Sequence, residues 1–495
     1  MLESANDAFA NKQPVTGYIR LCIAAQTAIS QRNYEEANCI INQAMEAEQH
    51  LSPTDLGPAK LRSTIASLRE LTGGTSELII RELIVGAGLW YDRLSAEVLQ
   101  RDDFEGIATS MHDHFRRLSR FLLLSGRTEE SLIAFEAGRA LAIAKDVAPQ
   151  ELQRLLSNKP FASDGSHVST ESLQRIRQNL TDEQVLISIA VLPPNLVGFV
   201  VSKYGVETVD VPVGRTVAEA DEVYREVGML PHRLANNVGV HAIPSSLKEF
   251  ARLLVEKTGK REICRFVPYA FYHAVPWRLL LRHHGLDWNQ LRFCTEFGVL
   301  LPFSNVSTHD VLGKGMVSIG HGDAMGIDLQ EEARAFAQQW GAGSNFDSNC
   351  SAQTIRHVLS ANQNLMISTH GRLAQRKFYL ELAEGSVSAS ELDLPQTIAS
   401  LVILSACWSG VYAMAIGDNP IGFAPLLLRQ GVRRCICTRW PIRAGFAGMF
   451  FPELATRLRT ALNIEDAFVD TLAWAENNGY DRWRDIACVE LIGRP

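Results

Sequence analysis

Hydrophobic positions in the first third of the chain follow a helical spacing. Over residues 1–157 apolar residues recur every three or four positions and strand-like alternation is scarce, which predicts an all-α region. Residues 158–182 are rich in polar and turn residues, so we interpret them as a linker. After this segment the pattern changes to alternating, β-branched runs such as Gln184–Ala190 and Asn195–Ser202. These runs predict a hairpin or meander.

Strands and helices alternate from Glu262 onward. Apolar runs that predict strands, among them Asn364–Thr369 and Leu401–Ala406, are separated by stretches with helical spacing. This alternation predicts a mostly parallel sheet with helices on both faces. Ser388 and Glu391 have the spacing of a capping box, so we expect a helix to begin there. Catalytic residues in such sheets lie beyond the carboxyl ends of the strands.

The helical region also carries a repeat signal. Patterns typical of two helices joined by a turn surround Tyr34 and Ser125–Thr128, and the first fits the tetratricopeptide period of about 34 residues. The two patterns are not separated by a multiple of that period, so we expect an irregular array with a longer pair or an insertion between Leu51 and Phe115. A generic helical bundle is the alternative. Either arrangement offers paired helices with a groove for docking a protein.

Composition and charge narrow the class of protein. The chain has 495 residues, of which 46% are hydrophobic and 21% charged, so it can bury a core and wholesale disorder is excluded. Its length predicts about three folding units. No apolar run approaches the roughly 18 residues of a membrane helix, and the first residues lack the order of a signal peptide. We therefore expect a cytoplasmic protein. The net charge of −7 argues against a broad nucleic-acid-binding surface.

The cysteines and histidines indicate no cofactor. The nine cysteines are scattered and form no Cys-x-x-Cys pair, so neither a structural zinc site nor a disulfide scaffold is expected. Cys435 and Cys437 share one side of an apolar strand and predict core packing. His112 and His114 are expected on a solvated helix face. No phosphate-binding glycine loop is present, so nucleotide use is not supported.

Two predicted strands end in reactive residues. His370 and Cys407 each lie at or just beyond the end of an apolar strand, and Gly371 and Gly410 follow them. If the strands are neighbours, both side chains reach one crevice, where an imidazole can assist a thiol. The N–H groups of Gly371 and Cys407 are the candidates for an oxyanion hole. Either residue alone would more often be an ordinary buried side chain, but the pair favours nucleophilic catalysis.

The residues around this pair resemble a known family. The segments 368–371 and 404–410 resemble the His-Gly and Ser-Ala-Cys-x-Thr-Gly motifs of CHAT domains, which are caspase-like, separase-related cysteine peptidases often found behind tetratricopeptide repeats. Further similar segments are Val267–Trp277, Phe423–Val432, Thr438–Ile442 and Glu490–Gly493. The resemblance covers residues 183–495. It implies a caspase-like α/β sandwich, with a non-catalytic pseudo-caspase half at 183–312 and a catalytic half at 313–495.

The resemblance also implies a mechanism and a substrate pocket. His370 would assist the Cys407 thiolate, which attacks a peptide carbonyl, and no third catalytic residue is needed. The residues expected to shape the pocket are Ser405, Trp408, Trp440 and Arg443, with Asp323 as a further candidate that is more readily explained as a turn residue. Trp408 and Arg443 depart from the family, which usually has a small or polar residue and acidic residues at these places. Without acidic residues, we expect a neutral, apolar or acidic residue before the cut, unless Arg443 is merely a solvated surface residue.

These expectations combine into one functional prediction. The chain is predicted to be an intracellular cysteine endopeptidase that is latent until a protein or nucleoprotein partner docks on residues 1–157, because a constantly active protease would be toxic. Its substrate is predicted to be a specific protein, in a bacterial antiviral defence or cell-death system. One alternative is a repeat scaffold with a degenerate peptidase domain, and another is an acyl transferase or amidase that uses the same dyad.

Overall fold

The structure is a computed structural model of the chain, and its residues group into two compact units. It describes residues 2–11, 13–52, 55–93, 104–142, 159–214, 217–236, 239–296, 298, 315–324, 327–374, 377–388, 391–410, 412–415 and 419–493. The first unit, here called the helical unit, consists mainly of Met1–Gln178, and the second, the sheet unit, is formed from Asn179 onward. None of the described helices has both the length and the apolar character needed to cross a membrane.

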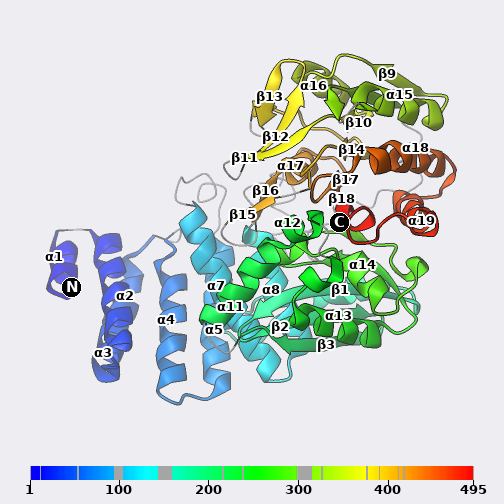
Figure 1. Ribbon diagram of the computed structural model, residues 1–495. Helices are drawn as coiled ribbons and strands as arrows, with labels where there is room; N and C mark the ends of the chain where they lie inside the picture. Colours follow the sequence, from blue (N-terminus) through cyan, green and yellow to red (C-terminus); the bar gives the residue numbers. More distant parts are fainter. Residues whose placement is uncertain are drawn as a thin grey trace. The chain divides into compact units, whose positions relative to one another are not determined.

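The helical unit is built from antiparallel helix pairs (Figure 1). Its described helices are α1 (Leu2–Ala10), α2 (Pro14–Ser30), α3 (Tyr34–Ala47), η1 (Glu48–His50), α4 (Gly57–Leu71), α5 (Ser76–Arg93), α7 (Phe104–Leu124), α8 (Thr128–Ala142) and α10 (Glu171–Gln178). The pairs α2–α3, α4–α5 and α7–α8 pack closely, so the predicted all-helical region is confirmed. Their second helices begin at Tyr34, Ser76 and Thr128, and these intervals exceed the tetratricopeptide period of about 34 residues.

Residues 159–178 of the expected linker belong to the helical unit. The ring of Phe161 lies 5.5 Å from that of Tyr91 and 5.4 Å from that of Phe115. Arg177 on α10 donates to Glu129 on α8 at 2.5 Å. Aromatic burial and this ion pair hold these residues on the helical unit, and the sheet unit begins at Asn179.

The expectation that His112 and His114 lie on a solvated face is wrong. Both are buried, because α7 packs between α5 and α8 and has no broad solvated side. The Nε2 of His114 lies 2.7 Å from the carbonyl oxygen of Leu83, and its Nδ1 bonds the hydroxyl of Ser63. Burial lowers the pKa of His112 to about 3 and that of His114 to about 4. These imidazoles are therefore neutral core groups near neutral pH.

The sheet unit contains one continuous sheet of eleven strands. Their order is β3-β2-β1-β4-β5-β18-β17-β14-β10-β6-β9. The bounds are β1 (Gln184–Leu192), β2 (Asn195–Ser202), β3 (Gly205–Pro212), β4 (Glu262–Val267), β5 (Cys294–Thr295), β6 (Met316–Gly320), β9 (Ser344–Asp347), β10 (Asn364–Ser368), β14 (Leu401–Ser405), β17 (Arg434–Thr438) and β18 (Val489–Gly493). The first three strands form the predicted antiparallel meander. The other pairings are parallel except β17 with β18, so the mostly parallel sheet is confirmed.

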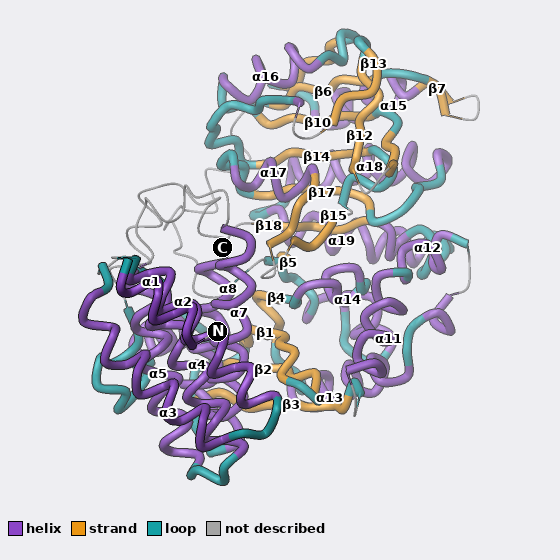
Figure 2. Tube along the Cα trace, turned by 90° about the vertical axis from the view of Figure 1, so that its left-hand side faces the viewer, coloured by secondary structure: helices purple, strands orange, loops and turns teal. Residues whose placement is uncertain are grey.

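Helices cover both faces of this sheet (Figure 2). They are α11 (Val217–Gly228), α12 (Leu230–Ala235), η3 (Gly239–Ala242), α13 (Ser245–Thr258), η4 (Ala270–Ala274), α14 (Trp277–His283), η5 (Trp288–Gln290), α15 (Leu329–Trp340), α16 (Ala352–Ser360), α17 (Phe423–Arg429), α18 (Ala444–Thr460), α19 (Ile464–Asn477) and η8 (Ile486–Cys488). Around β10 and β14, α15 and α18 lie on one face and α16 and α17 on the other. This arrangement confirms the predicted caspase-like layers.

Short antiparallel strands form small sheets beside the eleven-stranded sheet. They are β7 (Asp323–Ala324) with β8 (Ile327–Asp328), β11 (Gly371–Ala374) with β12 (Lys377–Leu382) and β13 (Gly385–Ser388), and β15 (Tyr412–Ala415) with β16 (Asn419–Gly422). The helix expected after Ser388 does not form over the described residues 391–400. Ser388 does donate to Glu391 through its amide and hydroxyl, both at 2.7 Å. However, Asp393 adopts a φ of 42°, which is not a helical value. Pro395 follows, and a proline cannot donate the hydrogen bond that would continue a helix.

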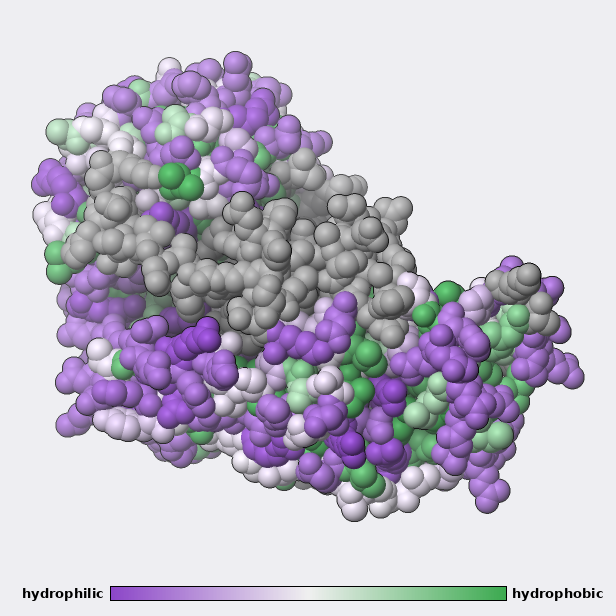
Figure 3. Space-filling model, turned by 180° about the vertical axis from the view of Figure 1, so that it is seen from behind, coloured by the Kyte–Doolittle hydropathy of each residue, from purple (hydrophilic) through white to green (hydrophobic). Residues whose placement is uncertain are grey.

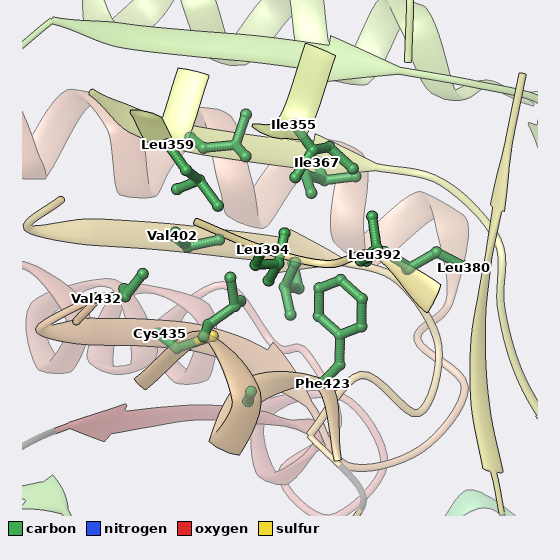
Figure 4. Packing of buried hydrophobic residues seen from close by; sticks show 14 of the residues in the cluster. Ile355, Leu359, Ile367, Leu380, Leu392, Leu394, Val402, Phe423, Val432 and Cys435 are labelled. Atoms are coloured by element: carbon green, nitrogen blue, oxygen red, sulfur yellow. The ribbon is translucent and has the colours of Figure 1, made fainter. Parts of the chain in front are cut away.

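The core beneath the candidate site is apolar and closely packed (Figure 4). Ile355 and Leu359 of α16 face Ile367 of β10 and Val402 of β14, and Phe423 of α17 closes the cluster. Cys435 and Cys437 are fully buried on β17 and belong to the same cluster, as the sequence predicted. A rigid core of this kind fixes the strands whose ends carry the candidate residues.

Candidate active site

The strand register brings His370 and Cys407 to the same end of the sheet. β10 and β14 are parallel neighbours, and Ser368 pairs with Ser405 at their carboxyl ends. The amide of Thr369 continues the contact by donating to the carbonyl of Ser405 at 3.2 Å. His370 and Cys407 each follow two residues after the paired serines, and both side chains are half-buried. The condition on which the predicted site depended, that the two strands are neighbours, is met.

Bonds to β17 fix the loop after Cys407. The hydroxyl of Ser409 donates to the carbonyl of Leu404 at 3.2 Å and accepts from the amide of Thr438 at 3.0 Å. In return, the Thr438 hydroxyl donates to the carbonyl of Ala406 at 2.6 Å, and the Gly410 amide donates to Thr438 at 2.8 Å. Within this loop Trp408 has a φ of 66°, an uncommon conformation for a residue with a side chain. The loop is therefore held in one sharp turn directly after the thiol.

Gly371 lies directly against the backbone of Cys407. A Cβ atom added to Gly371 would lie 1.9 Å from the Cys407 carbonyl oxygen, so no larger residue fits there. The carbonyl of His370 accepts a hydrogen bond from the Glu381 amide at 2.9 Å. His370 and Glu381 therefore form a hydrogen-bonded pair at the end of the antiparallel β11–β12 ladder. Because such pairs alternate, the amide of Gly371 points away from β12. In the described part of the chain the Cys407 amide donates to no backbone carbonyl.

Burial dominates the acidity of the Cys407 thiol. It raises the pKa of Cys407, while the amides of Ile442 and of Cys407 itself lower it and Glu332 raises it further. The balance is a pKa above the ordinary value of 9.0, so the thiol is protonated at neutral pH in this conformation. Because a thiolate is the nucleophile, catalysis requires a group that takes up this proton.

The loop after β6 packs against His370. A Cβ on Gly322, whose φ is 90°, would lie 3.2 Å from Cδ2 of the His370 ring. The amide of His321 donates to the carbonyl of Ser368 at 3.0 Å, which ties this loop to β10. The backbone of Asp323 begins β7 and pairs with Asp328. The side chain of Asp323, a predicted pocket residue, lies outside the part that the structure describes.

The predicted pocket residues have different surroundings. Ser405 is 4% exposed and Trp440 is fully buried, with its indole N–H donating to the carbonyl of Arg484 at 2.8 Å. Neither offers a surface to a substrate in this conformation. Trp408 is half-buried and packs on the exposed ring of His232 on α12, with ring centroids 4.7 Å apart.

Arg443 is not a free surface cation. Its Nε donates to Asp485 at 2.6 Å, and a second guanidinium nitrogen bonds the other carboxylate oxygen. Asp485 is 1% exposed and also accepts from the Asp481 amide at 3.1 Å. The arginine therefore neutralises a buried carboxylate beside the Trp440–Ile442 segment.

The sequence reasoning missed His232, Glu332 and Asp485. His232 and Asp485 reach the site from distant segments, and no local pattern marks them. Glu332 could have been found from the sequence, because its spacing places a carboxyl on the apolar side of α15 with Leu329 and Phe336. Among the described residues, His, Cys, Asp and Glu side chains form no group of three or more that could hold a metal ion.

Together, the layered sheet and its covering helices form a caspase-like fold. Residues 327–482 match the family model of the CHAT domain. A helical region precedes the residues that match this model.

Several solved structures resemble the chain at low identity. Separase in a separase–securin complex from Saccharomyces cerevisiae matches with a TM-score of 0.50 and 9% identity, over 100% of this chain and 48% of separase. A second such complex gives a TM-score of 0.46 at 9% identity, over 98% and 47%. The complex of the pro- and mature domains of Porphyromonas gingivalis RgpB gives 0.37 at 12%, over 56% and 77%. The chain thus spans about half the length of the separase chains. No curated protein matches it.

Proposed function

We propose that this chain is a cysteine endopeptidase with a His370–Cys407 dyad. The observation that carries the proposal is the parallel register of β10 and β14, which brings an imidazole and a thiol to the same end of two neighbouring strands. The CHAT domain match supports it. The separase likeness, at 9% identity, supports the fold only.

The proposed reaction proceeds in two stages. The thiol proton of Cys407 passes to the imidazole of His370, and the thiolate attacks the carbonyl carbon of a peptide bond. The N–H groups of Gly371 and Cys407 stabilise the oxyanion. The imidazolium then protonates the leaving amine as the C–N bond breaks, which leaves a thioester on Cys407. Water, deprotonated by His370, releases the acid and restores the thiol.

The proposed enzyme is latent at rest. Burial raises the pKa of Cys407, so activation must favour transfer of the thiol proton to the imidazole. We assign the activating partner, a protein or nucleoprotein, to the paired helices of the helical unit. Val15, Ile19 and Ile23 are 42%, 48% and 45% exposed along one side of α2. Figure 3 shows hydrophobic residues among hydrophilic ones over this unit. A cytoplasmic role in bacterial antiviral defence or cell death suits such a switch.

The proposed cleavage preference is for a neutral, apolar or acidic residue before the cut. The Arg443 guanidinium pairs with Asp485 near the Ile442 amide, which itself faces the thiol. A basic side chain would therefore find this carboxylate already paired. A fluorogenic peptide library that is cut best after Arg would exclude this preference.

The experiment that tests the function is co-expression with genomic neighbours, followed by intact-protein mass spectrometry. The wild type is compared with Cys407→Ala and His370→Ala. A neighbour cleaved only by the wild type establishes the peptidase and its cut site together. If the same protein is cut equally by Cys407→Ala, the proposed nucleophile is wrong.

A second candidate function is a scaffold whose peptidase-like domain only binds. It is favoured by the protonated state of the Cys407 thiol and by Trp408, which packs on His232 directly after it. The absence of any cleavage with partners present, together with partner binding that survives Cys407→Ala, would support the scaffold.

A further inference from the structure

A buried carboxyl lies under the two strand ends that carry the candidate dyad. Glu332 belongs to α15 and is 4% exposed. Its helix can approach the sheet closely because β6 ends in Gly320. A Cβ there would lie 2.6 Å from the Leu329 carbonyl oxygen and 2.7 Å from the Cα of Gln330. No step of the proposed reaction uses Glu332. Burying its carboxyl has an energetic cost unless the carboxyl is hydrogen-bonded.

The carboxyl of Glu332 is shared by both strands. The hydroxyl of Ser368 at the end of β10 donates to Oε1 of Glu332 at 2.9 Å. The hydroxyl of Ser405 at the end of β14 also faces this carboxyl, and its polar contact lowers the pKa of Glu332. These serines are direct neighbours in the sheet register, and each precedes one member of the dyad by two residues. One side chain thus bonds the first of these segments and contacts the second.

The surroundings favour the uncharged acid. Burial raises the pKa of Glu332, and the bonds from Ser405 and Ser368 offset only part of that rise. Charged side chains on neighbouring described elements have other partners: Glu453 pairs with Arg457 on α18, Asp328 accepts from the Gln330 amide, and Asp347 on β9 accepts from the Asn349 amide. His370 and Cys407 follow the strands themselves. An ionised Glu332 would raise the pKa of the Cys407 thiol, which would oppose catalysis.

We propose that Glu332 is a positioning residue, a buried carboxyl that clamps the ends of β10 and β14 and so keeps His370 and Cys407 in register. It touches no substrate. The inference deepens the proposed function, because it concerns the alignment of the same thiol. Its test needs no peptide substrate, so its failure can be told apart from the failure of the peptidase proposal.

The test is the pH profile of Cys407 alkylation by iodoacetamide in the full chain, followed by peptide mass spectrometry. Wild type is compared with Glu332→Gln and Glu332→Ala. Glutamine keeps the hydrogen bonds to the serines without a charge, so its profile should match the wild type within about twofold. Alanine removes the bond to Ser368 and the contact with Ser405, which leaves the strand ends loose. The thiol then becomes more exposed, its pKa falls, and alkylation at pH 8 should be at least about threefold faster.

Matched controls exclude a general loss of structure. Glu331→Ala removes an exposed carboxylate from the same helix, where it pairs with Arg334, and should leave the profile unchanged. If Glu332→Ala does not fold, Ser368→Ala combined with Ser405→Ala should reproduce the faster alkylation. The proposal is overturned if folded Glu332→Ala, or this double variant, reacts like wild type. It is also overturned if Glu332→Gln shifts the profile as far as Glu332→Ala does, because the charge rather than the bonds would then matter.

Discussion

The two halves of the eleven-stranded sheet differ in how deeply they bury the residues that follow their parallel strands. In the half that contains β1 and β4, the chain after β4 turns into η4, and His273 there is 3% exposed beside the buried Trp277. In the half that contains β10 and β14, His370 and Cys407 are half-buried. Both halves place a histidine shortly after a parallel strand, but only the second leaves it within reach of a ligand.

The buried polar groups of the two halves differ as well. The first half holds charges that pair with each other, as in Arg265 with Glu296. Arg278 is 7% exposed, and its guanidinium carbon lies 4.2 Å from the centroid of the Phe293 ring. At the ends of β10 and β14 in the second half, the buried groups are the Ser368 and Ser405 hydroxyls and the Glu332 carboxyl, although this half also holds a buried ion pair between Arg439 and Glu490 farther along the sheet. The ends of β10 and β14 therefore lie against a hydrogen-bonded acid, whereas the region after β4 contains a buried ion pair.

The largest expected effect is a loss of stability in the half that contains β1 and β4. Arg265→Met leaves Glu296, which is 4% exposed, without its partner, and should cost about 3–5 kcal/mol of unfolding free energy. Chemical denaturation measures the loss, and Cys407 alkylation should not change. Arg252→Ala breaks a pair that is 44% and 48% exposed and should change the free energy of unfolding far less, because solvent screens exposed charges. Equal costs for the two variants would refute the distinction.

The two halves should also differ in how they tolerate an added methyl group. Gly371→Ala forces a Cβ to within 1.9 Å of a backbone oxygen, so it should cost about 3 kcal/mol and alter Cys407 reactivity. Gly198→Ala on β2 meets the side-chain atom Cδ2 of Leu254 at 2.9 Å, which can move, so about 1 kcal/mol is expected. Thermal denaturation with thiol titration compares them. A Gly371→Ala protein with wild-type stability would show that the contact is not fixed.

A smaller effect is expected from the hydroxyl that holds the loop after Cys407. Ser409→Ala removes bonds to Leu404 and Thr438 in a buried site and should cost about 1–2 kcal/mol. Ser202→Ala in the other half removes a bond to Gly205 at 3.3 Å near a turn and should cost about 0.5 kcal/mol. Denaturant titrations of the two variants are compared directly. The reverse order would mean that the loop is not held by these bonds.

The smallest effect is a difference in thiol acidity between the halves. Burial raises the pKa of Cys264 on β4 to about 12, and it raises that of Cys407 as well, although the Ile442 amide opposes this rise. Below the pKa, the thiolate fraction rises about tenfold per pH unit. Alkylation of Cys407 should therefore still increase through pH 9, and it should run ahead of Cys264 at every pH. A Cys407 rate that levels off below pH 8 would show instead that the resting thiol is already activated.

The sequence predicted the local structure of both halves well. Alternation and β-branched residues predicted the β1-β2-β3 meander, and the apolar runs before His370 and Cys407 predicted β10 and β14. These features depend on neighbours in the chain, so periodicity and turn chemistry report them. Predictions on the same local basis were wrong where distant packing prevailed, as at His112 and His114 in the helical unit, which α5 and α8 enclose.

What the sequence by itself determined was the pair of reactive residues at strand ends, because each residue and its glycine are adjacent in the chain. Only the tertiary structure decided that β10 lies beside β14 with Ser368 opposite Ser405, and that the last strand, β18, enters between β5 and β17 to join the two halves. It also decided that Glu332 and Asp485 reach this region. These contacts join segments far apart in the chain, and their strength comes from burial in a shared core, which no local pattern encodes.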